Sequence, residues 1–113
     1  MPAADEPVID RAHLAQMTFG DRSLERELLE LFDRQAAMLI ARMRQSDPGV
    51  VATLAHTLNG SARGIGAGEV ARAAEAAELA ACEPAGACAA AVERLAAAIE
   101  DARALIGDML RAA

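Results

Sequence analysis

One histidine in this chain has the surroundings expected of a reactive side chain. His56 lies within the segment 54–66, which reads LAHTLNGSARGIG. In a helix of about 100° per residue, the apolar side chains of this segment fall on one side, and His56 points away from them. Asn59, Gly60 and Arg63 share its face at the i+3, i+4 and i+7 positions. We therefore predict an imidazole that stands in water among small neighbours, as suits a nucleophile whose other substrate is a protein.

The asparagine–glycine step after the histidine is a local signal against a helix. Asn-Gly favours a β-hairpin when alternating apolar residues flank it. The residues on both sides of Asn59 and Gly60 follow the helical period instead. A glycine inside a helix costs about 0.5–1 kcal/mol relative to alanine. We expect the helix to continue through this step, with function outweighing a local cost in stability.

Short and long helices are predicted around this segment. Asp10 and Asp21 are placed to cap the first two helices, and Asp47 with Pro48 begins the third. The five expected helices end at about residues 17, 45, 63, 82 and 110. Because short connections make consecutive helices antiparallel, we predict an all-α fold, an antiparallel up-down four-helix bundle with a short additional N-terminal helix. It forms one domain over residues 9–113, after a mobile tail at 1–8.

The apolar periodicity predicts which helix faces are buried. The second helix has the strongest pattern, with an expected core stripe of Leu24, Leu28, Leu31, Phe32, Gln35, Met38, Leu39 and Met43. The fifth helix is expected to turn inward Val92, Leu95, Ile99, Leu105 or Ile106, and Met109. Gly64, Gly66 and Gly68 are expected to form the turn between the third and fourth helices.

Composition and charge exclude several classes of function. The 113 residues include 30 alanines and two phenylalanines but no tyrosine or tryptophan, which favours helices over sheets or base-stacking surfaces. A net charge of −6 disfavours nucleic acid and anionic membrane surfaces as partners. No apolar run approaches the roughly 20 residues of a membrane span. The N-terminus lacks the pattern of a signal peptide, so we expect a cytoplasmic protein.

The two cysteines and the second histidine are expected to have structural rather than chemical roles. Cys82 and Cys88 lie six positions apart, which is not a C-x₂-C zinc or redox spacing. They are expected to be small residues at a helix–helix turn, with a reversible disulfide as the alternative. His13 is expected to be a surface or partly packed residue. No metal site is predicted.

The segment around the histidine resembles the signature of a known family. His56-Thr57-Leu58-Asn59-Gly60-Ser61-Ala62-Arg63, followed by Ile65-Gly66-Ala67, is similar to the H-x-L-K-G-[SA]-[SA] pattern of histidine-containing phosphotransfer (HPt) domains. The segment 28–32 resembles the second helix of that family. The segment 75–79 falls where the family has a fourth helix that bears a glutamate or glutamine. The resemblance implies the four-helix bundle expected above.

The resemblance also implies a function, that of a phosphocarrier in a two-component phosphorelay. His56 would accept a phosphoryl group from the aspartyl phosphate of one response-regulator receiver domain and pass it to another. The implied partners are receiver domains and a hybrid histidine kinase, and the expected state is a monomer. Such a carrier has no ATP site, kinase activity or cofactor of its own, and the chain has no P-loop. The Mg²⁺ that this chemistry uses would be bound by the receiver.

Roles for the neighbouring residues follow from this interpretation. The family usually has lysine where this chain has Asn59, so Arg63, one turn further on, is the candidate that stabilises the phosphoryl group. Glu78 is the candidate that orients the imidazole, by accepting a hydrogen bond from Nδ1–H while Nε2 reacts. Ala52 and Gly60 leave room for the partner. With Arg63 and Gly64, they form the predicted partner-binding surface.

Two other functions stay open at this point. The missing lysine gives some weight to a non-catalytic helical adaptor that binds a receiver or kinase without transferring phosphate. A metal-binding or redox bundle is the weakest hypothesis, because its ligands would be too few and badly spaced.

Overall fold

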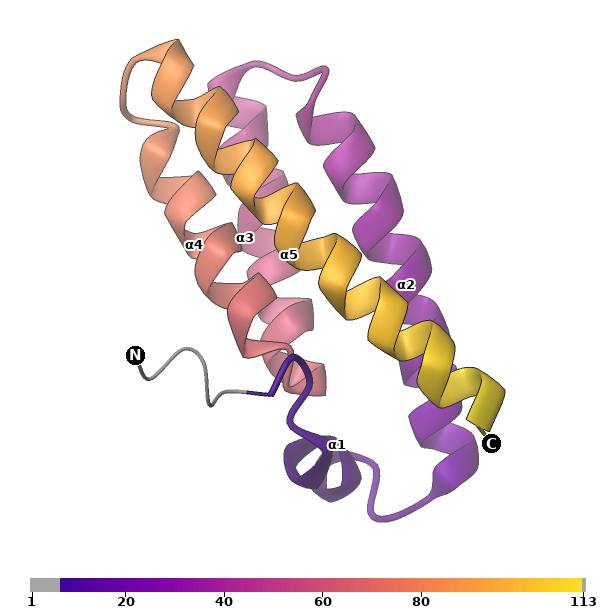
Figure 1. Cartoon of the computed structure of the whole chain (residues 1–113). Coiled ribbons are helices and arrows are strands. Elements are labelled where there is room, and N and C mark those ends of the chain that lie inside the picture. The colour runs from indigo at the N-terminus through magenta and orange to yellow at the C-terminus, as the bar shows by residue number, and fades with distance from the viewer. Residues whose placement is uncertain (1–6, 113) are drawn as a thin grey trace.

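Five helices make up the described part of the chain. A computed structural model describes residues 7–112. The helices are α1 (Arg11–Met17), α2 (Arg22–Met43), α3 (Pro48–Ile65), α4 (Gly68–Ala80) and α5 (Ala85–Ala112) (Figure 1). No strand occurs between residues 7 and 112. The predicted all-α fold is therefore confirmed.

The four longer helices form an antiparallel bundle, and α1 lies at one end of it. Figure 1 shows α2 to α5 side by side, with α1 below the end at which α3 finishes. Helix α2 contacts α3 and α5, α4 contacts the same two helices, and α1 contacts α3. This ring of contacts is the up-down bundle that short connections predict. No helix of the described chain is both long enough and apolar enough to pass through a membrane.

The three predicted N-cap residues all lie where helices begin. The Asp10 carboxylate accepts a hydrogen bond from the amide of His13, and that of Asp21 accepts from the amides of Ser23 and Leu24. Asp47 lies at the N-cap of α3 before a proline, but its side chain makes no capping bond. The amides of residues 50 and 51 instead donate to the backbone carbonyl of Asp47, at 3.0 and 2.9 Å. Asp47 and Pro48 therefore begin α3 as predicted, and the Asp47 cap acts through its backbone carbonyl.

Helix α3 buries the face that its sequence predicts and stays intact through the asparagine–glycine step. Its buried residues are Val51, Leu54, Ala55, Leu58, Ala62 and Ile65. Opposite them, α4 presents Ala71, Ala74 and Ala77, each no more than 1% exposed. Because the side chains at a contact set the distance between helix axes, this alanine-lined seam lets α3 and α4 approach closely.

The core face of α2 differs from the predicted stripe. The buried residues are Leu29, Phe32, Ala36, Leu39, Ile40 and Met43. Leu31 and Met38, which the periodicity places in the core, are each 54% exposed. Leu24, Leu28 and Gln35 are only partly buried. The helix carries two adjacent apolar ridges, and the core takes the one that begins at Leu29.

The predicted core face of α5 is confirmed in part. In α5, Val92, Leu95, Ile99 and Ile106 are buried, whereas Leu105 and Met109 are half-buried. Most of the expected N-terminal tail, residues 1–6, lies outside the described residues. Val8 packs against the core, and Ile9, where the domain is expected to begin, is buried.

The glycines between α3 and α4 have separate roles. Gly64 lies inside α3 and Gly68 is the first residue of α4, so the prediction that both form the turn is wrong. Gly66 ends α3 with a φ of 80°, in the left-handed region. Its carbonyl accepts from the amide of Asp10 at 2.9 Å, which ties the start of α1 to the end of α3.

Gly66→Ala is expected to destabilise the fold by about 2 kcal/mol or more. A Cβ at this position would lie 2.8 Å from the backbone oxygen of Asp10, in addition to the cost of a positive φ. Denaturant unfolding measures the effect. Gly64→Ala is the control, because a Cβ there meets nothing within 4 Å and helix propensity predicts a gain of about 0.5–1 kcal/mol. Equal effects at the two glycines would contradict this explanation of the Gly66 turn.

Candidate functional site

His56 lies in the middle of α3 on the face opposite its buried stripe. Its side chain is 74% exposed, as the sequence predicts. The helix is continuous from Pro48 to Ile65, so Asn59, Gly60 and Arg63 keep their helical positions around the imidazole. By the 100° rotation per residue, Gly60 and Gly64 lie on the side of His56 toward α2, and Asn59 lies on the side toward α4.

The carboxylate of Glu78 contacts the imidazole from α4. Nδ1 of His56 lies 3.1 Å from Oε2 and 3.3 Å from Oε1 of Glu78. An ionised carboxylate only accepts hydrogen bonds, so Nδ1 carries the proton and donates it. In a neutral ring, the lone pair is then on Nε2. The alanine-lined seam between α3 and α4 places the carboxylate close enough to select this tautomer.

A second polar contact links α3 to α4 beside the first. Nε of Arg63 donates to Oδ1 of Asn59 at 2.8 Å, and Nη2 donates to Oε2 of Glu75 at 3.0 Å. Side chains on a helix lean toward its N-terminus, so the guanidinium of Arg63 lies over the turn that leads back to His56. Arg63 and Asn59 are candidates from the sequence, but Glu75 has no role predicted there. The sequence places it at the start of the segment 75–79, one turn before Glu78.

An apolar groove lies on the other side of the histidine, between α2 and α3. It has a volume of about 260 Å³ and is lined by Met17, Leu28, Leu31, Phe32, Gln35, Ser61, Gly64 and Ile65. The exposed ridge of α2 borders it. The sequence does not predict this surface, because its periodicity assigns Leu31 and Met38 to the core. Of the predicted partner-binding residues, Gly64 lines the groove, Gly60 is exposed and Ala52 is half-buried.

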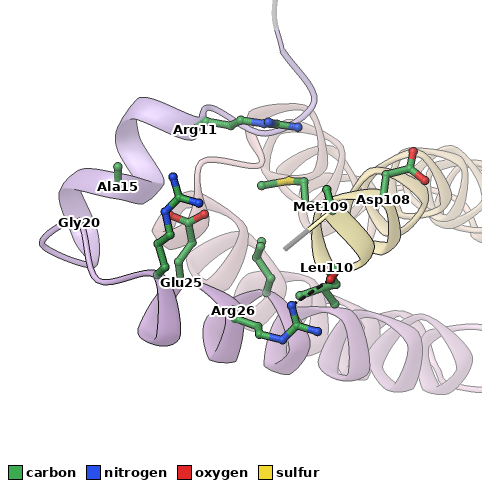
Figure 2. Close-up of a pocket in the computed structure, with 11 residues that line it drawn as sticks. Arg11, Ala15, Gly20, Glu25, Arg26, Asp108, Met109 and Leu110 are labelled. Atoms are coloured by element: carbon green, nitrogen blue, oxygen red, sulfur yellow. Dashed lines mark hydrogen bonds between the residues drawn. The ribbon is translucent and has the colours of Figure 1, made fainter.

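A larger cavity lies away from the histidine. Its volume is about 580 Å³, and it is an open pocket lined by residues of α1, the start of α2 and the end of α5 (Figure 2). Figure 2 shows Arg26 bonded to the backbone of Leu110, with Nη1 donating to the carbonyl oxygen at 2.9 Å. No residue of α3 or α4 lines this cavity. It therefore belongs to the packing of the bundle end and not to the His56 surface.

The other candidates for chemistry are separate from one another. His13 is half-buried, and its Nε2 lies 3.0 Å from the carbonyl oxygen of Arg63, where it links α1 to α3. Cys82 is exposed and Cys88 is buried, and both are free thiols. Within residues 7–112, no three His, Cys, Asp or Glu side chains are grouped so that they could hold a metal ion.

Comparison with known protein families identifies the family to which this chain belongs. The family model of the Hpt domain matches residues 26–105, which include α3, α4 and most of α2 and α5. The chain belongs to the Hpt domain family. This membership implies histidine phosphotransfer in phosphorelays and interaction with response-regulator receiver domains, and Hpt domains are phosphocarriers rather than kinases. Searches of curated proteins and of solved structures find no match.

Proposed function

We propose that this Hpt domain carries a phosphoryl group on Nε2 of His56 between two receiver domains. The observation that supports the site most directly is an imidazole 74% exposed whose Nδ1 is held 3.1 Å from the Glu78 carboxylate. Because Glu78 occupies the proton-bearing nitrogen, the reactive lone pair faces away from α4 and is available to a docked partner.

The transfer step needs only groups that the two proteins supply. Nε2 attacks the phosphorus of an aspartyl phosphate, a nitrogen–phosphorus bond forms, and the bond from phosphorus to the aspartyl oxygen breaks. The aspartate leaves with that electron pair as a carboxylate. The proton stays on Nδ1, where Glu78 stabilises the cationic ring. Phosphoryl transfer depends on in-line positioning and charge stabilisation, and the Mg²⁺ of the receiver supplies part of the latter.

Docking is assigned to the α2 side of the histidine. The groove and the exposed apolar ridge of Leu31 and Met38 supply contact area. Gly60 and Gly64 let the partner's backbone approach the imidazole. Such a surface suits a small, transient interface. In this proposal a hybrid histidine kinase feeds the relay, and the carrier works as a monomer in the cytoplasm.

The test is transfer from phosphorylated receiver domains. The protein is mixed with receivers of its source organism that carry labelled phosphate, in the presence of Mg²⁺, and the labelled product is characterised. Acid-labile, base-stable label on the chain is the expected result, because phosphohistidine has that stability. If receivers bind the chain without labelling it, the phosphocarrier hypothesis is wrong and the non-catalytic adaptor is favoured. The observation that supports an adaptor is Asn59, which stands where the family usually has lysine.

Glu78→Ala is expected to slow transfer roughly fivefold, the effect of losing one exposed charge-assisted contact of about 1 kcal/mol. Imidazole nitrogen NMR measures the ratio of the two His56 tautomers. The share of the Nδ1–H tautomer is expected to fall, because its proton loses the acceptor. Glu78→Gln is the matched control, since its amide oxygen still accepts from Nδ1–H. A tautomer ratio that is unchanged in Glu78→Ala would remove Glu78 from the mechanism.

A further inference from the structure

The contacts between α3 and α4 contain two parallel pairs, and the carrier function uses only one of them. Glu78 bonds His56, and Glu75, one turn earlier on α4, bonds Arg63. Both pairs are exposed, with more than half of the Arg63 and Glu75 side chains open to water. Exposed ion pairs are weak, of order 0.2–1 kcal/mol. The Arg63–Glu75 pair is therefore easily exchanged for a stronger anionic partner.

Phosphorylation would bring such a partner into this part of the surface. A phosphoryl group on Nε2 carries close to two negative charges, and Glu75 and Glu78 already place two carboxylates on the adjoining helix. The guanidinium of Arg63 lies between Asn59 and Glu75, over the turn that leads to His56. It presents several donors in a planar fork that matches phosphoryl oxygens.

We propose that Glu75 is a positioning residue that holds the Arg63 guanidinium beside His56 and competes with the phosphoryl group for it. In the free carrier, Glu75 and Asn59 keep the side chain extended along α3. In the phosphorylated carrier, Arg63 moves its Nη donors from Glu75 to the phosphoryl oxygens. This inference rests on the proposed function, since it assigns a role to the charges around the same histidine.

The competition has a consequence for a relay. An arginine without a competing partner would stabilise the phosphohistidine fully and make the phosphoryl group harder to pass on. Because each contact with the phosphoryl group here replaces one with Glu75, the net stabilisation is smaller. Glu75 therefore reduces the free-energy difference between the free and the phosphorylated carrier. A small difference suits a carrier that must pass its phosphoryl group to a second receiver.

The test measures the last ionisation of the phosphohistidine by ³¹P NMR. The small phosphoryl donor phosphoramidate phosphorylates the protein in a His13→Gln background, so that His56 is the one histidine present. A cation on the phosphoryl oxygens favours the dianion and lowers its pKa. Glu75→Gln is expected to lower that pKa by about 0.15–0.7 unit, the range of one exposed ion pair. Arg63→Met is expected to raise it.

The double variant separates a competition for Arg63 from simple charge repulsion. In the Arg63→Met background, Glu75→Gln is expected to shift the pKa by less than half as much as it does with Arg63 present. Glu69→Gln is the matched control, the same charge change at an exposed position of α4. Arginine Nε and Nη NMR signals supply a second readout, and those of Arg63 are expected to move on phosphorylation.

Two results would overturn the proposal. One is a Glu75→Gln shift of equal size with and without Arg63, and the other is a shift no larger than that of Glu69→Gln. Because phosphoramidate acts without a receiver, either result leaves receiver-dependent transfer to His56 standing. Conversely, if no receiver labels the chain, the proposed function is wrong. The competition for Arg63 can still be measured in that case, because phosphoramidate supplies the phosphoryl group.

Discussion

His56→Gln is expected to remove all detectable label from the protein when phosphorylated receivers are the donors. Glutamine has nearly the reach of histidine, but its amide nitrogen has no basic lone pair with which to attack phosphorus. The fold should be unaffected, because the side chain is 74% exposed and surface substitutions change the free energy of unfolding by no more than about 0.5 kcal/mol. Phosphate transfer and thermal unfolding, measured on the same sample, check both statements.

The second histidine of the chain supplies the matched control. His13→Gln makes the same chemical change, and a glutamine amide can still donate to the Arg63 carbonyl that His13 contacts. This variant should be labelled at the wild-type rate. Label that persists in His56→Gln, or label that disappears in His13→Gln while the fold is intact, would place the phosphoryl group elsewhere.

Gly60→Gln is expected to stabilise the protein and to slow phosphotransfer on the order of a hundredfold. The stabilisation, about 0.5–1 kcal/mol, follows from replacing a mid-helix glycine, and a Cβ at this position meets nothing within 4 Å. The loss of transfer follows from a side chain that stands one turn from His56 on the docking side. Displacing a reacting group by about 1 Å costs about this much in rate. Unfolding and single-turnover transfer rates measure the two effects.

A second glycine of α3 separates docking from helix stability. Gly49 also lies in α3, and a Cβ there would likewise meet nothing within 4 Å, but it is two turns before His56. Gly49→Gln should leave the transfer rate within about twofold, as expected of a substitution outside the interface. If both variants slowed transfer equally, the docking surface would not lie around Gly60.

The sequence predicts the buried and exposed faces of α3 well because both of its signals agree. The apolar residues from Val51 to Ile65 form one stripe, and the polar and small residues form another, so a single rotation of the helix satisfies both. The asparagine–glycine step does not break the helix, because tertiary packing of Leu58 and Ala62 on either side outweighs one local cost.

The sequence predicts α2 less well because two ridges of apolar residues compete for the core. The ridge through Leu28, Leu31 and Met38 and the ridge that begins at Leu29 are one residue apart, and both have helical periodicity. Hydrophobicity alone does not say which ridge packs inward and which serves a partner. The same limit applies to Glu75, whose partner is set by the rotation of α4 against α3 and not by any motif.

The alanines beneath the site have a consequence for how this surface can change over evolution. Ala55, Ala74 and Ala77 are fully buried, yet their small size decides whether a carboxylate from α4 reaches the imidazole. A leucine at any of them would act as a wedge, lengthening the 3.1 Å contact while every surface residue stayed in place. The contact of an exposed histidine with its carboxylate thus depends on buried residues that lie outside any partner's reach.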